Sequence, residues 1–210
     1  MISPRVFTGG DLATNGYVLE GREGAVCFDA PEGMARELAR HNIKPVALVL
    51  THGHFDHMWD AALIQEDHQC PVYIHPADAP MVLDTSYVKM FGVVPPIRAP
   101  SEVINFEIPD QGSAKFVCAG EEFQIFHIPG HSPGSVAFYH PGWGVLISGD
   151  TLFCGGVGRW DLPGGSRSAL LQGLRKHLLP LPAETRVYAG HGPSTTIGDE
   201  CETNPFLSSM

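Results

Sequence analysis

Four apolar segments of this chain, each rich in β-branched or aromatic residues, run directly into a histidine or an aspartate. Segments of this kind predict buried strands, and loops at the ends of strands hold side chains as rigidly as metal ligands require. The segments are VALVLT (46–51), FQIFHI (123–128), GVLISG (144–149) and RVYAG (186–190). The polar residues that follow them are, in chain order, His52, His54, Asp56, His57, His131, Asp150 and His191.

Neutral imidazole and carboxylate groups suit borderline metals such as zinc. Five imidazoles and two carboxylates exceed the needs of one tetrahedral site, but they supply two sites that share a bridging group. The alternative interpretation is a histidine-rich surface loop, since 11 of the 210 residues are histidine. The spread of the same residue types over four strand ends favours the metal site.

Further apolar stretches between Gly, Pro, Asn and Asp predict the remaining strands at 15–20, 25–29, 72–75 and 135–140. Helical patterns cover 33–41, 58–67 and 166–179, the last with a leucine stripe typical of core packing. The least regular part of the chain is 91–121, and within it the proline-containing stretch FGVVPPIRAPSE (91–102) predicts an ordered loop over the surface. Strands at both ends with helices between them favour an α/β sandwich, folded as a single domain over 1–210.

Composition excludes several classes of protein. A formal net charge of −10 argues against nucleic acid as a partner. Five cysteines, odd in number and without a CxxC pair, favour free thiols in a reducing compartment. The first ten residues lack the apolar stretch of a signal peptide, and no run of 18 apolar residues predicts a membrane helix. We therefore expect a cytoplasmic protein that needs no membrane.

The motifs together resemble the metallo-β-lactamase superfamily. They are HGHFDH (52–57), PGHSPG (129–134), GDTLF (149–153) and GH (190–191). Within that superfamily, SGDTLFCGGVGRWDLPGGS (148–166) and GHGPSTTIGDECETNPF (190–206) are similar to the small glyoxalase II-like hydrolases. The resemblance implies an α/β (α+β) fold, a four-layer αββα sandwich with its metal site at one edge between the two sheets.

The same resemblance implies an assignment of the metal ligands. His52, His54 and His131 would hold the first metal, Asp56, His57 and His191 the second, and Asp150 would bridge both together with a water or hydroxide. Two divalent ions are expected, with zinc first and iron or manganese as alternatives. Each ion lowers the pKa of bound water, so a bridging hydroxide becomes available for attack near neutral pH. Asp56 and Asp150 are the residues expected to act in catalysis.

Two residues outside the ligand positions have two interpretations each. Arg159 corresponds to a basic residue that contacts glutathione in glyoxalase II-like proteins, and an ion pair with Asp161 is the structural alternative. Asp29 either orients a metal-bound histidine or caps a helix. Full-length glyoxalase II carries a C-terminal helical domain, and we expect none here, where 19 residues follow His191. Asp161 also stands where relatives carry an aromatic residue, which leaves the thiol half of the substrate open.

The leading functional hypothesis is a thioester hydrolase acting on S-lactoylglutathione or a related small-molecule acyl thioester. A thiolate leaves without a dedicated general acid, because its reference pKa is about 8.5. The alternative is a mononuclear iron persulfide dioxygenase acting on glutathione persulfide, with His54, His131 and Asp150 as ligands. A β-lactamase, a nuclease and a non-catalytic binding module are weaker hypotheses, the last because every ligand position is filled. We expect a monomer or a small homo-oligomer.

Overall fold

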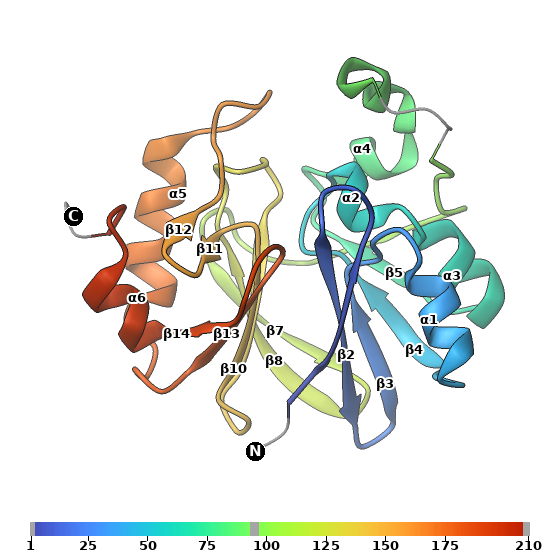
Figure 1. Ribbon diagram of the computed structural model, residues 1–210, viewed down its shortest axis with the longest axis horizontal. Coiled ribbons are helices and arrows are strands. Elements are labelled where there is room, and N and C mark those ends of the chain that lie inside the picture. The colour runs from blue at the N-terminus through green and yellow to red at the C-terminus, as the bar shows by residue number, and fades with distance from the viewer. Residues whose placement is uncertain (1–2, 93–96, 208–210) are drawn as a thin grey trace. The chain divides into compact units, whose positions relative to one another are not determined.

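The computed structural model describes residues 3–92 and 97–207, and for residues 90 and 91 it describes the backbone alone. Contacts divide the chain into two compact units. Among the described residues, the N-terminal unit comprises 4–92, 97–106 and 118–121, and the C-terminal unit comprises Ser3, 107–117 and 122–207. Each unit has a sheet and its own helices (Figure 1).

The sheet of the N-terminal unit has six strands in the order β1-β2-β3-β4-β5-β6. The first three pair antiparallel, and β3 to β6 pair parallel. The apolar, β-branched stretches GAVCF and PVALV form the central parallel pair β3 and β4, as such runs do where strands are buried. The strands are β1 Arg5–Gly9, β2 Thr14–Gly21, β3 Gly24–Phe28, β4 Pro45–Val49, β5 Val72–Ile74 and β6 Ile104–Asn105.

Helices of the N-terminal unit pack against this sheet through one apolar cluster. Met34 and Leu38 of α1, Ile64 of α3 and Val82 of α4 are buried there against strand residues such as Leu48. The helices are α1 Met34–Arg40, α2 Phe55–Met58, α3 Ala61–His68, α4 Ala79–Leu83 and the 3₁₀ helix η1 Thr85–Phe91. The short α2 follows the end of β4 and carries two of the predicted ligands.

The sheet of the C-terminal unit also has six strands, in the order β14-β13-β10-β9-β8-β7. β10 and β13 are parallel neighbours, whereas β10 pairs antiparallel with β9. A separate hairpin joins β11 to β12. The strands are β7 Ser113–Cys118, β8 Glu121–His127, β9 Val136–His140, β10 Val145–Gly149, β11 Leu152–Phe153, β12 Gly156–Val157, β13 Arg186–Ala189 and β14 Thr195–Thr196.

The predicted leucine stripe forms the helical side of the second core. Leu170, Leu174 and Leu178 are fully buried and belong to one cluster with Leu146 and Val187 of the sheet. The helix begins at a Ser166 N-cap, whose hydroxyl accepts from the Ala169 N–H. It runs as α5 Arg167–Gly173 and continues as a π-helical turn η2 Leu174–Leu178, and a further helix α6 spans Ile197–Thr203.

The prediction of a mixed α/β fold built on two sheets is confirmed, and all eight predicted strands are present. Residues 97–103 lie outside helices and strands, in agreement with the loop predicted for 91–102, whose residues 93–96 are outside the described residues. Strands β6 and β7, which lie later in the irregular stretch 91–121, were not predicted. Strand β7 escaped prediction because the turn that joins it to β8 is Ala119–Gly120. Both residues have positive φ, of 52° and 74°, as a type I′ hairpin turn requires. Asparagine or aspartate is typical at the first position of such a turn, so the alanine there gave no indication of a hairpin.

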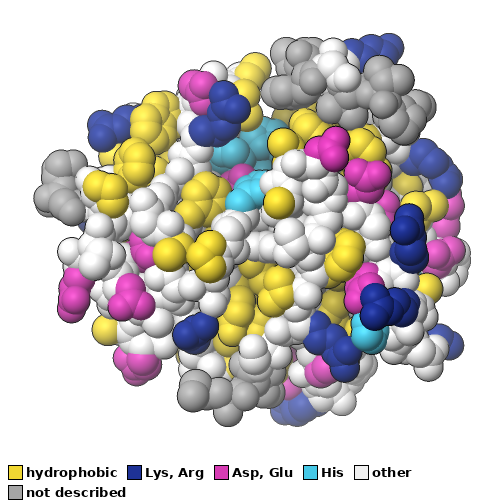
Figure 2. Space-filling view, viewed as in Figure 1, with side chains coloured by type: hydrophobic (Ala, Val, Ile, Leu, Met, Phe, Trp, Pro, Cys, Tyr) yellow, Lys and Arg dark blue, Asp and Glu magenta, His cyan; other side chains and the backbone are white. Residues whose placement is uncertain are grey.

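No helix among the described residues combines the length and the apolar character needed to span a bilayer. On the face drawn in Figure 2, the Lys and Arg side chains stand in small groups, several of them beside acidic side chains. All five cysteines are free thiols. The prediction of a single domain over 1–210 stays a prediction.

Candidate metal centre

Four of the predicted ligands, His52, His54, Asp56 and His57, lie close together in the N-terminal unit; we call them the N-terminal set. Strand β4 ends at Val49, the two histidines of the HGH turn follow, and α2 then carries Asp56 and His57 in its single turn. The ring centroids of His52 and His57 are 4.1 Å apart, and those of His52 and His54 are 4.7 Å apart. His52 and His57 are fully buried. The spacing of the motif alone therefore gathers these side chains.

Asp29, at the end of β3, is the buried anchor of this set. Its Oδ1 accepts the Thr51 N–H at 2.8 Å, and its Oδ2 accepts both the Thr51 hydroxyl and the Nδ1–H of His57 at 2.8 Å. The residue has φ of 58°, a left-handed conformation that aspartate tolerates better than most residues. Helix α1 begins after Gly33 with no side-chain cap, so the orienting interpretation of Asp29 is the one observed.

These contacts decide which ring nitrogens carry a lone pair. His57 donates through Nδ1, which leaves its lone pair on Nε2. Because the Thr51 hydroxyl proton lies on Asp29, the Thr51 oxygen accepts from Nδ1 of His52 at 3.0 Å. His52 thus also has its lone pair on Nε2. Neutral imidazoles fixed in one tautomer by such partners are the usual form of metal-binding histidine.

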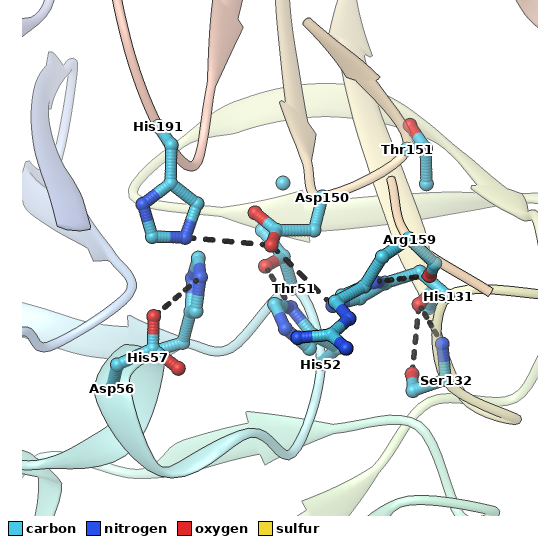
Figure 3. A network of polar contacts seen from close by, with 12 residues as sticks. Thr51, His52, Asp56, His57, His131, Ser132, Asp150, Thr151, Arg159 and His191 are labelled. Carbon is cyan, nitrogen blue, oxygen red and sulfur yellow. Dashed lines mark hydrogen bonds and ion pairs between the residues drawn. The ribbon is translucent and has the colours of Figure 1, made fainter. Parts of the chain in front are cut away.

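Asp56 of the N-terminal set is held from strand β2. Thr14 donates its hydroxyl to Oδ2 of Asp56 at 2.7 Å, and the same oxygen lies 3.4 Å from Nε2 of His57 (Figure 3). Two ligands at about 2.0 Å from one tetrahedral ion are about 3.3 Å apart. The spacing of this nitrogen and this oxygen therefore fits two ligands of one ion.

The turn at Gly53 is fixed by two residues that the sequence did not indicate. Its N–H donates to Oδ2 of Asp78 at 2.9 Å, and its carbonyl accepts the Tyr87 hydroxyl at 2.8 Å. Burial raises the pKa of Tyr87 well above its usual range, and the charges of Asp56 and Asp78 raise it further. Tyr87 consequently stays protonated as a donor. Contacts 25 and 34 residues apart leave no local pattern by which they could have been predicted.

The remaining predicted ligands, His131, Asp150 and His191, lie together in the C-terminal unit and form the C-terminal set. Asp150 follows β10 and His191 follows β13, and these strands are parallel neighbours joined at their ends by Gly190 N–H donating to Gly149 O at 2.9 Å. Parallel strands end at the same edge of a sheet. Nε2 of His191 consequently lies 3.4 Å from Oδ2 of Asp150 (Figure 3).

His131 reaches the same carboxylate from the loop after β8. Gly130 has φ of 137°, and a Cβ there would lie 2.5 Å from the Ser166 carbonyl oxygen, so glycine is required where the loop meets the start of α5. His131 donates from Nδ1 to the Arg159 carbonyl at 2.9 Å. Its Nε2 thus carries the lone pair and lies 3.4 Å from Oδ2 of Asp150. The C-terminal set repeats the spacing expected of ligands that share an ion.

The side chain of Arg159 pairs with Asp161. Nε and an Nη nitrogen each donate to one carboxylate oxygen at 2.8 Å, and both side chains are about 60% exposed, at 60% and 63%. This pairing lowers the pKa of Asp161 to about 2. The structural interpretation of Arg159 is thus observed, and its exposed guanidinium remains within reach of solvent.

A family model described as the metallo-beta-lactamase superfamily matches residues 9–191. A probable metallo-hydrolase of Bacillus subtilis is 34% identical over 203 residues, covering 95% of this chain and 94% of that protein. A hydroxyacylglutathione hydrolase of Haemophilus influenzae is 33% identical over 182 residues, covering 85% and 83%.

Solved structures point in several functional directions. The crystal structure of the BLEG-1 B3 metallo-beta-lactamase is 36% identical, with a TM-score of 0.88 and coverage of 98% of this chain and 100% of that one. TTHA1623 in a di-iron-bound form is 42% identical, with a TM-score of 0.85 and coverage of 97% and 100%. ETHE1 from Myxococcus xanthus is 25% identical, with a TM-score of 0.77 and coverage of 99% and 85%.

Proposed function

Because the chain belongs to the metallo-β-lactamase superfamily, we propose that it is a dinuclear metal-dependent thioester hydrolase of glyoxalase II-like type. Its substrate would be S-lactoylglutathione or a related acyl thioester. The observation that supports the proposal is a set of His and Asp donors in which His52, His57 and His131 each donate from Nδ1 and present the lone pair of Nε2. The similarity to a hydroxyacylglutathione hydrolase supports the thioester. Family membership itself indicates a metal-dependent hydrolase.

In this proposal the N-terminal and C-terminal sets serve one centre. His52, His54 and His131 hold the first ion, Asp56, His57 and His191 the second, and Asp150 bridges them. When bound, two divalent ions supply Lewis acidity and lower the pKa of water to a value near neutrality. Zinc suits this mixture of imidazole and carboxylate, and the di-iron form of TTHA1623 makes iron the main alternative, with manganese as a second.

The residues of the chain then divide the work. Asp56 and Asp150 neutralise part of the metal charge and fix the position of the attacking water. Asp29 and Thr51 hold the rings of His52 and His57 in the tautomer that binds. No general acid is needed for a leaving thiolate, whose reference pKa is about 8.5.

Arg159 is proposed to bind the thiol half of the substrate. Its exposed guanidinium suits a carboxylate or a carbonyl, and exchange of Asp161 for a substrate group would keep its charge paired. A cytoplasmic location, a monomer or small homo-oligomer, and the absence of nucleic acid or membrane partners complete the proposal. The acidic composition and the free cysteines support these points.

A second candidate is a mononuclear iron persulfide dioxygenase acting on glutathione persulfide. Similarity to ETHE1 favours it, and its ligands would be His54, His131 and Asp150. It differs from the hydrolase in leaving Asp56 and His57 without a metal role. A β-lactamase activity, favoured by the similarity to BLEG-1, is the third activity to be measured.

The test counts metal ions per chain in the purified protein and measures three activities on the same preparation. These are S-lactoylglutathione hydrolysis, oxygen uptake with glutathione persulfide, and β-lactam hydrolysis. The hydrolase predicts two ions and thioester cleavage, and Asp56→Ala should lower the count toward one ion and reduce the rate. Asp67→Asn, a change of an exposed carboxylate in the same unit, is the control.

One iron per chain that survives Asp56→Ala, together with persulfide-dependent oxygen uptake and no thioester cleavage, would replace the hydrolase by the dioxygenase. Cleavage of a β-lactam without cleavage of any thioester would contradict the substrate class while keeping the dinuclear centre.

A further inference from the structure

Glu200 on helix α6 is a buried carboxylate that the proposed chemistry does not use. It is 1% exposed, and a buried glutamate is uncommon unless its oxygens are fully bonded. Its Oε1 accepts the Thr195 hydroxyl at 2.7 Å. Its Oε2 accepts the Gly155 N–H at 2.9 Å and the Asn204 side-chain amide at 2.7 Å. The Glu200 carboxylate of helix α6 thus binds the turn of the β11–β12 hairpin through the Gly155 N–H.

Asn204, at the end of the same helix, forms a hydrogen bond with the other side of that turn. Its amide nitrogen also donates to the carbonyl of Gly156 at 3.0 Å. The turn is therefore held through one N–H and one carbonyl, and Gly155 takes φ of 69°, a left-handed conformation in which glycine is unstrained. These four contacts lie wholly within the C-terminal unit. They involve Thr195, Glu200 and Asn204 of the segment TTIGDECETNP (195–205).

The hairpin held in this way connects Asp150, a member of the C-terminal set, to Arg159, whose carbonyl contacts His131 of that set. Asp150 stands two residues before β11, and Arg159 stands two residues after β12. Between them, Gly158 passes so close to Asp150 that a Cβ would lie 1.9 Å from its carbonyl oxygen and 3.1 Å from Cβ of His131. The carbonyl of Arg159 then accepts the Nδ1–H of His131. A shift of the turn therefore acts on two proposed ligands at once.

We propose that Glu200 is a positioning residue for the metal centre, which fixes the hairpin that aims the Asp150 carboxylate and orients the His131 ring. It touches neither metal nor substrate. This inference rests on the proposed function for the identity of the ligands. Its consequence is that metal affinity depends on a carboxylate buried on a helix outside both sets.

The experiment measures Zn²⁺ affinity and stoichiometry by competition with a chromogenic chelator, for the wild type and for Glu200→Gln and Glu200→Ala. Co²⁺ loading of the same proteins reports ligand geometry through its visible absorption. Glu202→Gln, an exposed glutamate on the same helix, is the matched control. Thermal unfolding of the metal-free proteins shows whether each variant folds.

We expect Glu200→Ala to bind Zn²⁺ about 10- to 100-fold more weakly, the usual effect of removing a group that orients a ligand. The Co²⁺ spectrum of Glu200→Ala should change as well, and Glu202→Gln should match the wild type in both. The amide of Glu200→Gln can donate from its NH₂ to the Thr195 hydroxyl while its oxygen still accepts from Gly155 and Asn204. Glu200→Gln should therefore restore much of the affinity and spectrum that Glu200→Ala loses.

A folded Glu200→Ala with wild-type Zn²⁺ affinity and Co²⁺ spectrum overturns the inference, even if its unfolding temperature falls. If Glu200→Ala fails to fold, Asn204→Ala replaces it, since it removes the contact to Gly156, and wild-type affinity in that variant overturns the inference equally. Metal is measured without thioester. A wild type that binds two ions but cleaves no thioester overturns the proposed function alone, whereas a wild type that binds no ion overturns both.

Discussion

The two sets of proposed ligands are built in opposite ways. The N-terminal set comes from six consecutive residues, 52–57. A single buried carboxylate, Asp29, orients His57 directly and orients His52 through Thr51. The C-terminal set comes from three separate loops at 131, 150 and 191, and one of its two histidines, His131, is oriented by a backbone carbonyl, that of Arg159. A side-chain anchor can be removed by one substitution, whereas a backbone anchor depends on the path of a whole loop. The two sets should therefore fail in different ways when they are perturbed.

The largest effect is expected at Asp150, which contacts both histidines of the C-terminal set. Asp150→Ala removes a ligand and a negative charge, so the remaining donors hold two cations poorly screened from each other. Both ions should be lost or weakened, and thioester hydrolysis should fall by on the order of 10³-fold or more, several kcal/mol of barrier. Metal analysis and initial rates on one preparation measure this. Two firmly bound ions in a folded Asp150→Ala would refute the bridging role.

A smaller effect is expected at the anchor of the N-terminal set. Asp29→Asn keeps the left-handed backbone that asparagine also tolerates, but one amide oxygen cannot replace both carboxylate oxygens. Either the Thr51 N–H at Oδ1 or the His57 Nδ1–H at Oδ2 would then face the amide NH₂. Zn²⁺ affinity should fall about 10- to 100-fold, and the buried unsatisfied donor should reduce the free energy of unfolding by about 1–3 kcal/mol.

Chelator competition and denaturant unfolding measure the two effects of Asp29→Asn. Loss of stability with unchanged metal affinity would show that Asp29 serves the fold and not the N-terminal set.

The backbone anchor of the C-terminal set is tested at Gly158. Gly158→Ala introduces a Cβ 1.9 Å from the Asp150 carbonyl oxygen, so the loop must move, at a cost of about 1–3 kcal/mol. The displaced Arg159 carbonyl should then release Nδ1 of His131 and lower metal affinity. Gly156→Ala is the matched control, because its nearest contact is an ordinary 3.7 Å to Phe153. Equal behaviour of the two alanine variants in unfolding and Zn²⁺ binding would contradict a rigid loop.

The smallest effect is expected at Arg159, which stands on the same loop but outside both sets. Arg159→Ala should raise KM for the thioester about 10-fold, the value of one charged hydrogen bond, with kcat and metal content unchanged. The unfolding temperature should stay within about 2 °C, since exposed ion pairs contribute little.

The Arg159 effect should also be independent of pH between about 5 and 8. In the folded protein, Arg159 lowers the pKa of Asp161 to about 2. The ion pair is therefore complete at every pH above the ordinary pKa of an aspartate, and it is lost only when the pH falls through about 2. A KM that changes with pH in the wild type and not in Arg159→Ala would point to another titrating partner.

Sequence alone determined the fold class, all eight predicted strands and the seven candidate ligands, because apolar periodicity and a ligand at each strand end are local properties. Strand β7 was not predicted because the turn that follows it is Ala119–Gly120. A type I′ turn is usually recognised by Asn-Gly or Asp-Gly, and alanine at the first position does not indicate one.

Only the tertiary structure decided how the ligands are oriented. The tautomer of His52 follows from Thr51 and Asp29, the path of the His131 loop from Ser166, and the position of the 150–159 hairpin from Glu200 and Asn204. Each of these contacts joins elements that are distant in the chain or depends on a backbone carbonyl, which has no identity in the sequence. Hydrogen-bond geometry of this kind arises only when strands and helices pack, and for that reason the residue types could be read from the sequence while the direction of their lone pairs could not.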